Sequence, residues 1–269
     1  MDKFSNATTW VNMFSQTLNG GHIVSPREKD VFEMEDFQIS IDPRVPFMTF
    51  EARKYDINYF KAEMIWKLSA NKYNDSIIDR AKLWKEVQNP NGTFNSNYGQ
   101  YWFGEQMGFF GVITELMRDP DSRRAVIPML SKDHLTPETT DTVCTECIGF
   151  RIRNYQLNMS VHMRSSDQIL GLGTDIPTFS FLYRLVYAVL KDSFKDLQIG
   201  RITITAMSSH IYCKHADMVM KIIEQGVKSF DPIEMPWAKS SSEALFIVAG
   251  RGDRLDLGGE LGRWLGDTE

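Results

Sequence analysis

The chain has 269 residues, of which 42% are hydrophobic and 24% charged, and its formal net charge at pH 7 is −5. This length and composition are typical of a soluble globular protein with a substantial core. The negative charge excludes a global basic field for nucleic acid or anionic membrane, so an anion site must come from a local group of arginines. Apolar runs fall short of the roughly 18 residues of a membrane span, and residues 1–10 lack a signal-peptide core, so we expect a cytoplasmic protein.

The three cysteines, Cys144, Cys147 and Cys213, are an odd number in a fairly large chain, which predicts reduced thiols and no disulfide framework. Internal repeats, low-complexity tracts and long Pro/Gly/Ser linkers are absent from the sequence. We therefore expect a single domain over residues 1–269.

Two helices are predicted in the first half of the chain. The first covers residues 56–70, begins after an aspartate cap, and places Glu63 on one face with Tyr59 and Trp66. The second runs from about Glu105 to Met117 and stops at an Asp-Pro-Asp turn.

From Cys147 the apolar residues recur with a period of two, which predicts a β-hairpin. Its strands cover residues 147–153 and 157–164, and a polar turn at 154–156 joins them. The remaining predicted elements are a helix from Pro177 to about Lys191, a strand region over 201–214, and a helix over 215–225 that ends at Gly226. Strands and helices mixed without regular βαβ alternation predict an α/β (α+β) fold and not a doubly wound sheet.

Two local motifs have weak functional interpretations. The glycines of LGLG suggest a dinucleotide loop, but the third glycine of that motif would fall at Ile176. Cys144 and Cys147, with Cys213 and His215, could form a structural zinc site, but only one CxxC pair is present and the upstream His-x-Glu of zinc deaminases is missing. We favour Cys147 and Cys213 as buried, small apolar side chains.

Other candidate residues have ordinary explanations when they are taken singly. Asp175, before Ile176-Pro177, has the local pattern of a helix N-cap. Glu63 alone could be a surface residue or a buried ion-pair partner, and adjacent arginines such as Arg123 and Arg124 are usually solvated. Their functional interpretation depends on their conjunction.

Taken together, these motifs resemble the thymidylate synthase superfamily. The family's nucleophilic cysteine is followed six residues later by an aromatic residue, as Cys144 is by Phe150. The other matching segments are Arg27, Glu63-Met64-Ile65-Trp66, Asn97-Tyr98-Gly99, Asp119 to Arg124, Arg164-Ser165-Ser166-Asp167, Leu170-Gly171 and His210-Ile211-Tyr212.

The resemblance implies a mixed β-sheet covered by helices and a homodimer whose sheets pack back to back. It also implies a nucleotide substrate and 5,10-methylenetetrahydrofolate as co-substrate, with no metal, no direct nucleic-acid binding and no membrane. It also implies a role for each matching residue. The reacting groups would be Cys144 as the nucleophile, Glu63 as the proton relay and Asp175 as the reader of the base. The phosphate would be held by Arg27, Arg164 and Ser165, while Arg123 and Arg124 would reach the partner's site, and the sugar would be held by His210 and Tyr212. The folate would contact Asp167, Trp84 and Gly171, and Tyr98 would line the site.

Departures from the synthase pattern point to dCMP, as in the phage dCMP hydroxymethylases. Asp175 stands where synthases have asparagine, and a protonated carboxyl can donate to N3 of cytosine and accept from its amino group. Val87, Val143 and Thr145 also depart from the synthase residues, and GGELGRWLGDTE lacks the synthase's apolar closing tail. The product would be 5-hydroxymethyl-dCMP, formed in the host cytoplasm if the protein is phage-encoded.

Several alternatives remain open from the sequence. They are a dUMP hydroxymethylase, a thymidylate synthase, and a nucleotide- or zinc-binding regulatory protein on the same scaffold. The spacing of the motifs does not distinguish ribose from deoxyribose, or water from hydride in the last step.

Overall fold

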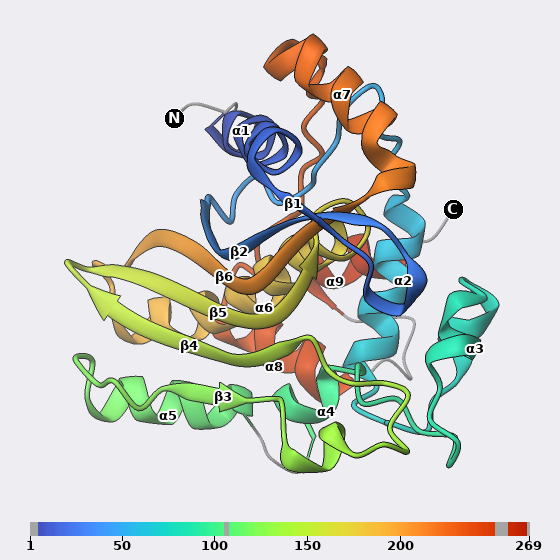
Figure 1. The fold of residues 1–269 in the computed structure, drawn as a ribbon. Coiled ribbons are helices and arrows are strands. Elements are labelled where there is room, and N and C mark those ends of the chain that lie inside the picture. The colour runs from blue at the N-terminus through green and yellow to red at the C-terminus, as the bar shows by residue number, and fades with distance from the viewer. Residues whose placement is uncertain (1–4, 105–107, 251–257, 268–269) are drawn as a thin grey trace.

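The computed structural model describes residues 5–104, 108–250 and 258–267, and within them the strands form one six-stranded sheet of order β1-β2-β6-β5-β4-β3 (Figure 1). Strands β5 and β6 are parallel, and the other neighbours are antiparallel. The predicted mixed sheet is therefore confirmed. The strands are β1 (His22–Val24), β2 (Val31–Ile41), β3 (Val126–Pro128), β4 (Thr145–Arg153), β5 (Gln156–Asp167) and β6 (Gln198–Tyr212).

The predicted hairpin is confirmed as β4 and β5. Its turn is Asn154-Tyr155, with φ of 50° and 59°, the two-residue geometry that fits the twist of paired strands. The alternating apolar residues of β5 are at most 1% exposed, so this period-two pattern faces the core. β5 extends past the predicted end at residue 164 to Asp167, which brings the segment 164–167 to the edge of the core.

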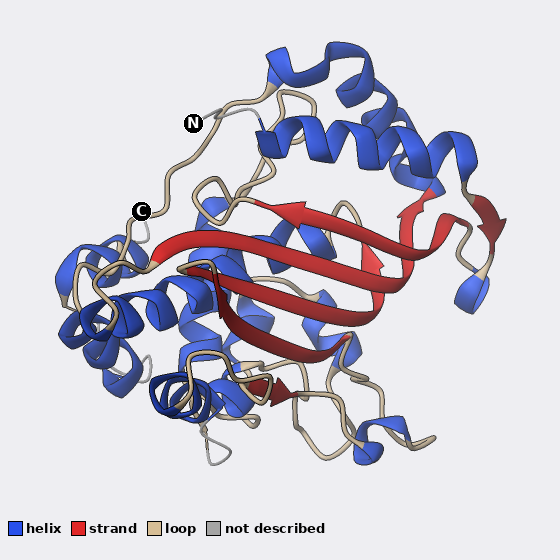
Figure 2. Cartoon of the chain, turned by 90° about the vertical axis from the view of Figure 1, so that its left-hand side faces the viewer, coloured by secondary structure: helices blue, strands red, loops and turns tan. Residues whose placement is uncertain are grey.

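The helices cover one face of the sheet, and α6 is the most deeply buried of those that the structure describes. In Figure 2 the opposite face of the sheet is turned toward the viewer, and no described helix crosses it. None of the described helices is long and apolar enough to cross a membrane. The helices are α1 (Ser5–Gly20), α2 (Ile57–Leu68), α3 (Leu83–Val87), α4 (Gly99–Trp102), α5 (Gly108–Arg118), α6 (Gly171–Ser193), α7 (Ala216–Gln225), α8 (Ser241–Gly250) and α9 (Gly259–Gly266).

Most of the predicted helices form close to their expected bounds. Asp56 caps α2 by accepting from the backbone N–H of Tyr59 at 2.9 Å, and Gly226, with φ of 62°, ends α7. The predicted helix over residues 105–117 corresponds to α5, and its expected start at Glu105 lies outside the described residues.

The predicted start of the central helix at Pro177 is wrong, because α6 begins at Gly171 and contains Pro177. The Asp167 carboxylate accepts from the backbone N–H groups of Ile169 (2.9 Å) and Leu170 (3.3 Å) and so organises the turn before the helix. Burial of the helix along almost its whole length outweighs the cost of one internal proline. Asp175 is consequently a helix-interior residue and not an N-cap.

Candidate active site

Cys144 lies just before β4, and Arg164 on the neighbouring strand holds it in place. The Arg164 Nη2 atom lies 3.6 Å from the Cys144 Sγ and donates to the Thr142 carbonyl at 2.6 Å, while Nε donates to the Val143 carbonyl at 3.0 Å. The Arg164 backbone N–H also donates to the Cys144 carbonyl at 2.9 Å. One arginine therefore fixes both the thiol and the backbone that carries it.

The pKa of the Cys144 thiol lies above its ordinary value because burial raises it more than the Arg164 guanidinium lowers it. Asp175 and Asp141 raise this pKa further, and Arg27 lowers it. The neutral thiol is thus the resting form, and Arg164 and Arg27 supply the charges that favour the thiolate.

The segment before Cys144 is fixed by a buried aspartate. Asp141 is 3% exposed, and its carboxylate accepts from the backbone N–H of Ser96 at 2.8 Å. The Asn89 Oδ1 accepts from the backbone N–H groups of Thr140 and Asp141, each at 3.0 Å. These contacts join the loop 89–97 to the segment before Cys144 and limit the movement of that segment.

On α2, Glu63 forms a buried ion pair with Lys67. The Lys67 Nζ lies 2.6 Å from the Glu63 Oε1, and the two side chains are 2% and 7% exposed. The turn at Gly99 packs directly on this part of α2: a Cβ at Gly99 would lie 1.5 Å from the Lys67 carbonyl oxygen, so glycine is required there. The preceding Tyr98 therefore lies against the ion pair, with Lys67 Nζ 4.9 Å from its ring centre.

Asp175 lies in the same cluster from the side of α6. Burial raises its pKa to about 7; the Lys67 charge lowers it, and Glu63 raises it. Asp175 in turn raises the pKa of Tyr98 and of Cys144. Residues from four separate parts of the sequence thus converge on one site.

The Trp84 side chain is linked to this cluster through Tyr59. The Trp84 Nε1 donates to the Tyr59 hydroxyl at 3.0 Å, and Tyr59 also hydrogen-bonds to Glu63. Trp84 packs on Trp66, with ring centres 4.9 Å apart. The Trp84 indole therefore borders the site, and it packs in a small hydrophobic cluster around Trp66 and Phe94 that is separate from the main core.

At the end of β5, Asp167 pairs in register with His210 of β6, and the rings of His210 and Tyr212 meet edge to face. Burial lowers the pKa of His210, while Asp167 and Glu33 raise it. His210 is 9% exposed, so its polar edge has limited access to solvent.

Three more predicted site residues are Arg27, Ser165 and Gly171. Arg27 is exposed, with a left-handed φ of 53°, and its charge acts on Cys144 and His210. Ser165 pairs in register with Ser208, and Gly171 lies against Asp175, since a Cβ there would be 3.8 Å from its Oδ2.

Arg123 and Arg124 are exposed on the loop between α5 and β3. Arg123 lines a cavity of about 260 Å³ on the open face of the sheet, together with Cys147 and His162. The charge of Arg124 acts on Glu115 of α5.

Cys147 and Cys213 are free thiols and only half-buried, so the expectation of buried apolar side chains is wrong for both. Cys147 lies within β4 and lines the cavity on the open face of the sheet, and Cys213 begins the short 3-10 helix Cys213–His215 after β6. Among the described residues, no cluster of three or more His, Cys, Asp or Glu side chains has the arrangement of a metal site.

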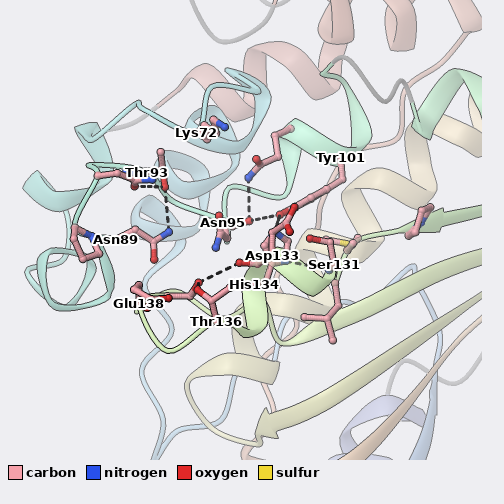
Figure 3. Close-up of a pocket in the computed structure, with 17 residues that line it drawn as sticks. Lys72, Asn89, Thr93, Asn95, Tyr101, Ser131, Asp133, His134, Thr136 and Glu138 are labelled. Carbon is pink, nitrogen blue, oxygen red and sulfur yellow. Dashed lines mark hydrogen bonds between the residues drawn. The ribbon is translucent and has the colours of Figure 1, made fainter.

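A larger cavity of about 590 Å³ lies between the loop 89–101 and the segment 128–139 (Figure 3). Its central polar groups are paired with one another. The His134 Nδ1 accepts from the backbone of Ser131, its Nε2 lies 3.2 Å from the Tyr101 hydroxyl, and Tyr101 donates to the Asn95 carbonyl. Cys144 does not line this cavity.

Sequence reasoning did not identify Lys67 or Asp141, and it placed Tyr59 only on the same helix face as Glu63. The spacing of Lys67, four residues after Glu63 on a predicted helix, was the available signal for an ion pair. Asp141 acts through tertiary contacts that have no local pattern, and the same holds for the contact of Tyr59 with Trp84.

This fold, with a thiol beside acid–base side chains, defines an enzyme, and the thymidylate synthase family model matches residues 9–248, so the chain belongs to that family. It is similar to the deoxycytidylate 5-hydroxymethyltransferase of Enterobacteria phage T4, with 28% identity over 170 residues that cover 60% of this chain and 69% of the relative. The deoxyuridylate hydroxymethyltransferase of Bacillus phage SP01 is 23% identical over 219 residues, 76% of this chain and 56% of the relative. A thymidylate synthase of Fusobacterium nucleatum is 29% identical over 178 residues, 64% of this chain and 61% of the relative.

Proposed function

We propose that this protein is a dCMP 5-hydroxymethylase, which converts dCMP and 5,10-methylenetetrahydrofolate to 5-hydroxymethyl-dCMP and tetrahydrofolate. The observation that carries the proposal is Asp175, a carboxyl group with a pKa of about 7 that acts electrostatically on Cys144. Similarity to a deoxycytidylate 5-hydroxymethyltransferase supports the same substrate.

Asp175 explains the choice of base. Near neutral pH a large part of this carboxyl group keeps its proton, so it can donate to N3 of cytosine and accept from the exocyclic amino group. N3 of cytosine is a basic nitrogen, whereas N3 of uracil carries a proton. Transfer of the Asp175 proton to N3, which pairs the carboxylate with a protonated base, is therefore possible with cytosine and not with uracil.

The reaction begins when the Cys144 thiolate adds to C6 of the pyrimidine, with Arg164 favouring the thiolate. C5 then becomes nucleophilic and attacks the methylene carbon of the folate. Loss of the C5 proton and release of tetrahydrofolate leave an exocyclic methylene group, to which water adds, and the Cys144–C6 bond breaks. We assign to Glu63 the relay of protons through bound water.

The remaining groups bind the substrates. A 5′-phosphate dianion suits forked guanidinium and hydroxyl donors, which Arg27, Arg164 and Ser165 supply. His210 and Tyr212, two residues apart on β6, would hold the sugar 3′-hydroxyl. On the folate side we place Trp84, which bonds to Tyr59, Asp167 as the pterin contact, and Gly171, which lies against Asp167 and Asp175. Tyr98, beside Lys67, would close the pocket under the base.

We propose that residues 1–269 form one catalytic domain and that two copies associate through the open face of the sheet. That face carries polar side chains such as Arg151, which donates to Ser160 at 2.6 Å, and the exposed His162. Arg123 lines a cavity on this face and Arg124 is exposed on the same loop, from which both would reach the partner's phosphate site. The substrates of the proposed reaction would place it in the cytoplasm.

The test is mass spectrometry of the products after parallel incubations of the protein with methylenetetrahydrofolate and either dCMP or dUMP. The proposal predicts hydroxymethylated dCMP at a higher kcat/KM than any product from dUMP. Preferred hydroxymethylation of dUMP, or its methylation, would contradict the assignment of the substrate.

A further inference from the structure

Lys67 is an unusual residue for the interior of this site. It is 1% exposed, and its ammonium contacts three groups: Glu63 at 2.6 Å, the Thr178 hydroxyl at 3.3 Å, and the ring face of Tyr98 at 4.9 Å. An ammonium group has three N–H donors, and two of these contacts are with oxygen acceptors while the third is a cation–π contact. Lys67 is therefore committed to protein groups, and contact with a substrate would require one of these interactions to break.

Lys67 has carboxyl neighbours on two helices, α2 and α6. Two carboxyl groups, Glu63 of α2 and Asp175 of α6, share the site, and the charge of Glu63 raises the pKa of Asp175. A lysine is costly to bury unless it is paired, and an apolar side chain would pack the same helix without that cost. The other titratable groups that act on these carboxyls or on Tyr98 are Tyr55, Tyr59, Cys144, Asp141 and Asp167.

We propose that Lys67 is a positioning residue, which holds the Glu63 carboxylate in its relay orientation and supplies the charge that allows Glu63 and Asp175 to occupy one pocket. This inference rests on the proposed function and deepens it. Glu63 would keep its negative charge as the proton relay, while Asp175 would keep its proton for the base. The two carboxyl groups would thus have different roles because only one of them pairs with Lys67.

The matched experiment compares Lys67→Met with Lys61→Met. Lys61 is 7% exposed and lies on the same helix, but it contacts the Asp267 carbonyl and the Trp264 ring at 5.0 Å from Nζ. The first readout is infrared titration of the Asp175 carboxyl in the free protein, identified by the band that Asp175→Asn removes. The Lys67 charge lowers the pKa of Asp175, so we expect Lys67→Met to raise the midpoint from about 7 by roughly one pH unit or more.

The second readout is turnover. We expect Lys67→Met to lower kcat by ~10²-fold, because a displaced relay residue loses much of its acid–base contribution, and Lys67→Arg to recover most of that loss. Lys61→Met should change neither readout. If Lys67→Met does not fold, Lys67→Gln removes the charge and keeps a donor for Glu63, and the same rise in the midpoint is expected.

An unchanged Asp175 midpoint in the Lys67 variants, or an equal shift in Lys61→Met, would overturn the inference. The infrared titration needs no nucleotide, so its result is separate from the proposed function. Absence of a hydroxymethylated product from the wild-type protein would refute the proposed function, while the midpoint would still decide whether Lys67 controls the charge state of the pocket.

Discussion

Replacement of Asp175 by asparagine should reduce the preference for dCMP over dUMP. Asparagine has nearly the same size as aspartate, but its amide group has no acidic proton that it could transfer to N3 of cytosine. A hydrogen bond with charged character contributes about 1.5–3 kcal/mol, against about 0.5–1.5 kcal/mol for a neutral one. The loss of about 1–2 kcal/mol corresponds to a decrease of about 5- to 30-fold in the ratio of kcat/KM for dCMP to that for dUMP.

The assay is direct competition between the two nucleotides across a range of pH. In the wild-type protein, activity on dCMP should fall as pH rises through about 7, because the carboxyl loses its proton, and this fall should be absent in Asp175→Asn. The matched control is Thr174→Ala, since Thr174 lies beside Asp175 on α6 and its hydroxyl bonds to the backbone of Leu170. An unchanged ratio together with an unchanged pH dependence would refute the assignment of Asp175 as the base reader.

Three further predictions test the rest of the site. Cys144→Ala should reduce turnover by at least ~10³-fold while leaving dCMP affinity measurable by calorimetry, and retained turnover would exclude the covalent route. Alkylation of Cys144 by iodoacetamide should have a pH midpoint above that of an ordinary thiol, and Arg164→Gln should raise this midpoint further. A midpoint at the ordinary value would contradict the effect of burial on the Cys144 pKa. Gly99→Ala should lower the free energy of unfolding by about 3 kcal/mol, because its Cβ meets the Lys67 carbonyl. Urea denaturation measures this loss, and the reference variant Asp56→Ala, which removes the cap of α2, should lose only about 1 kcal/mol.

Elements with a strong local pattern could be predicted from the sequence. The period of two in β4 and β5 reflects burial of alternate residues, and the cap at Asp56 is made by the residue's own side chain. The helix α1 and the strand β2 were not predicted. β2 buries its two ends but leaves its middle partly exposed, so its apolar alternation is weak.

The convergence of the site residues followed from resemblance to a family, because their sequence separations exceed any local period. The start of α6 was misplaced because Pro177 is the strongest local signal there, whereas tertiary burial and the Asp167 turn determine where the helix begins. Lys67 shows the same limit: its spacing from Glu63 is compatible with an ion pair, but only the packing of Tyr98 and Thr178 around it places that pair inside the site.

The most direct test of the proposed reaction is a single incubation of the protein with dCMP and methylenetetrahydrofolate in water enriched in heavy oxygen, followed by mass spectrometry of the nucleotide. We expect the product to gain the mass of a hydroxymethyl group that contains the heavy oxygen atom. A product that gains only a methyl group, or a hydroxymethyl group without the label, would contradict addition of solvent water as the final step.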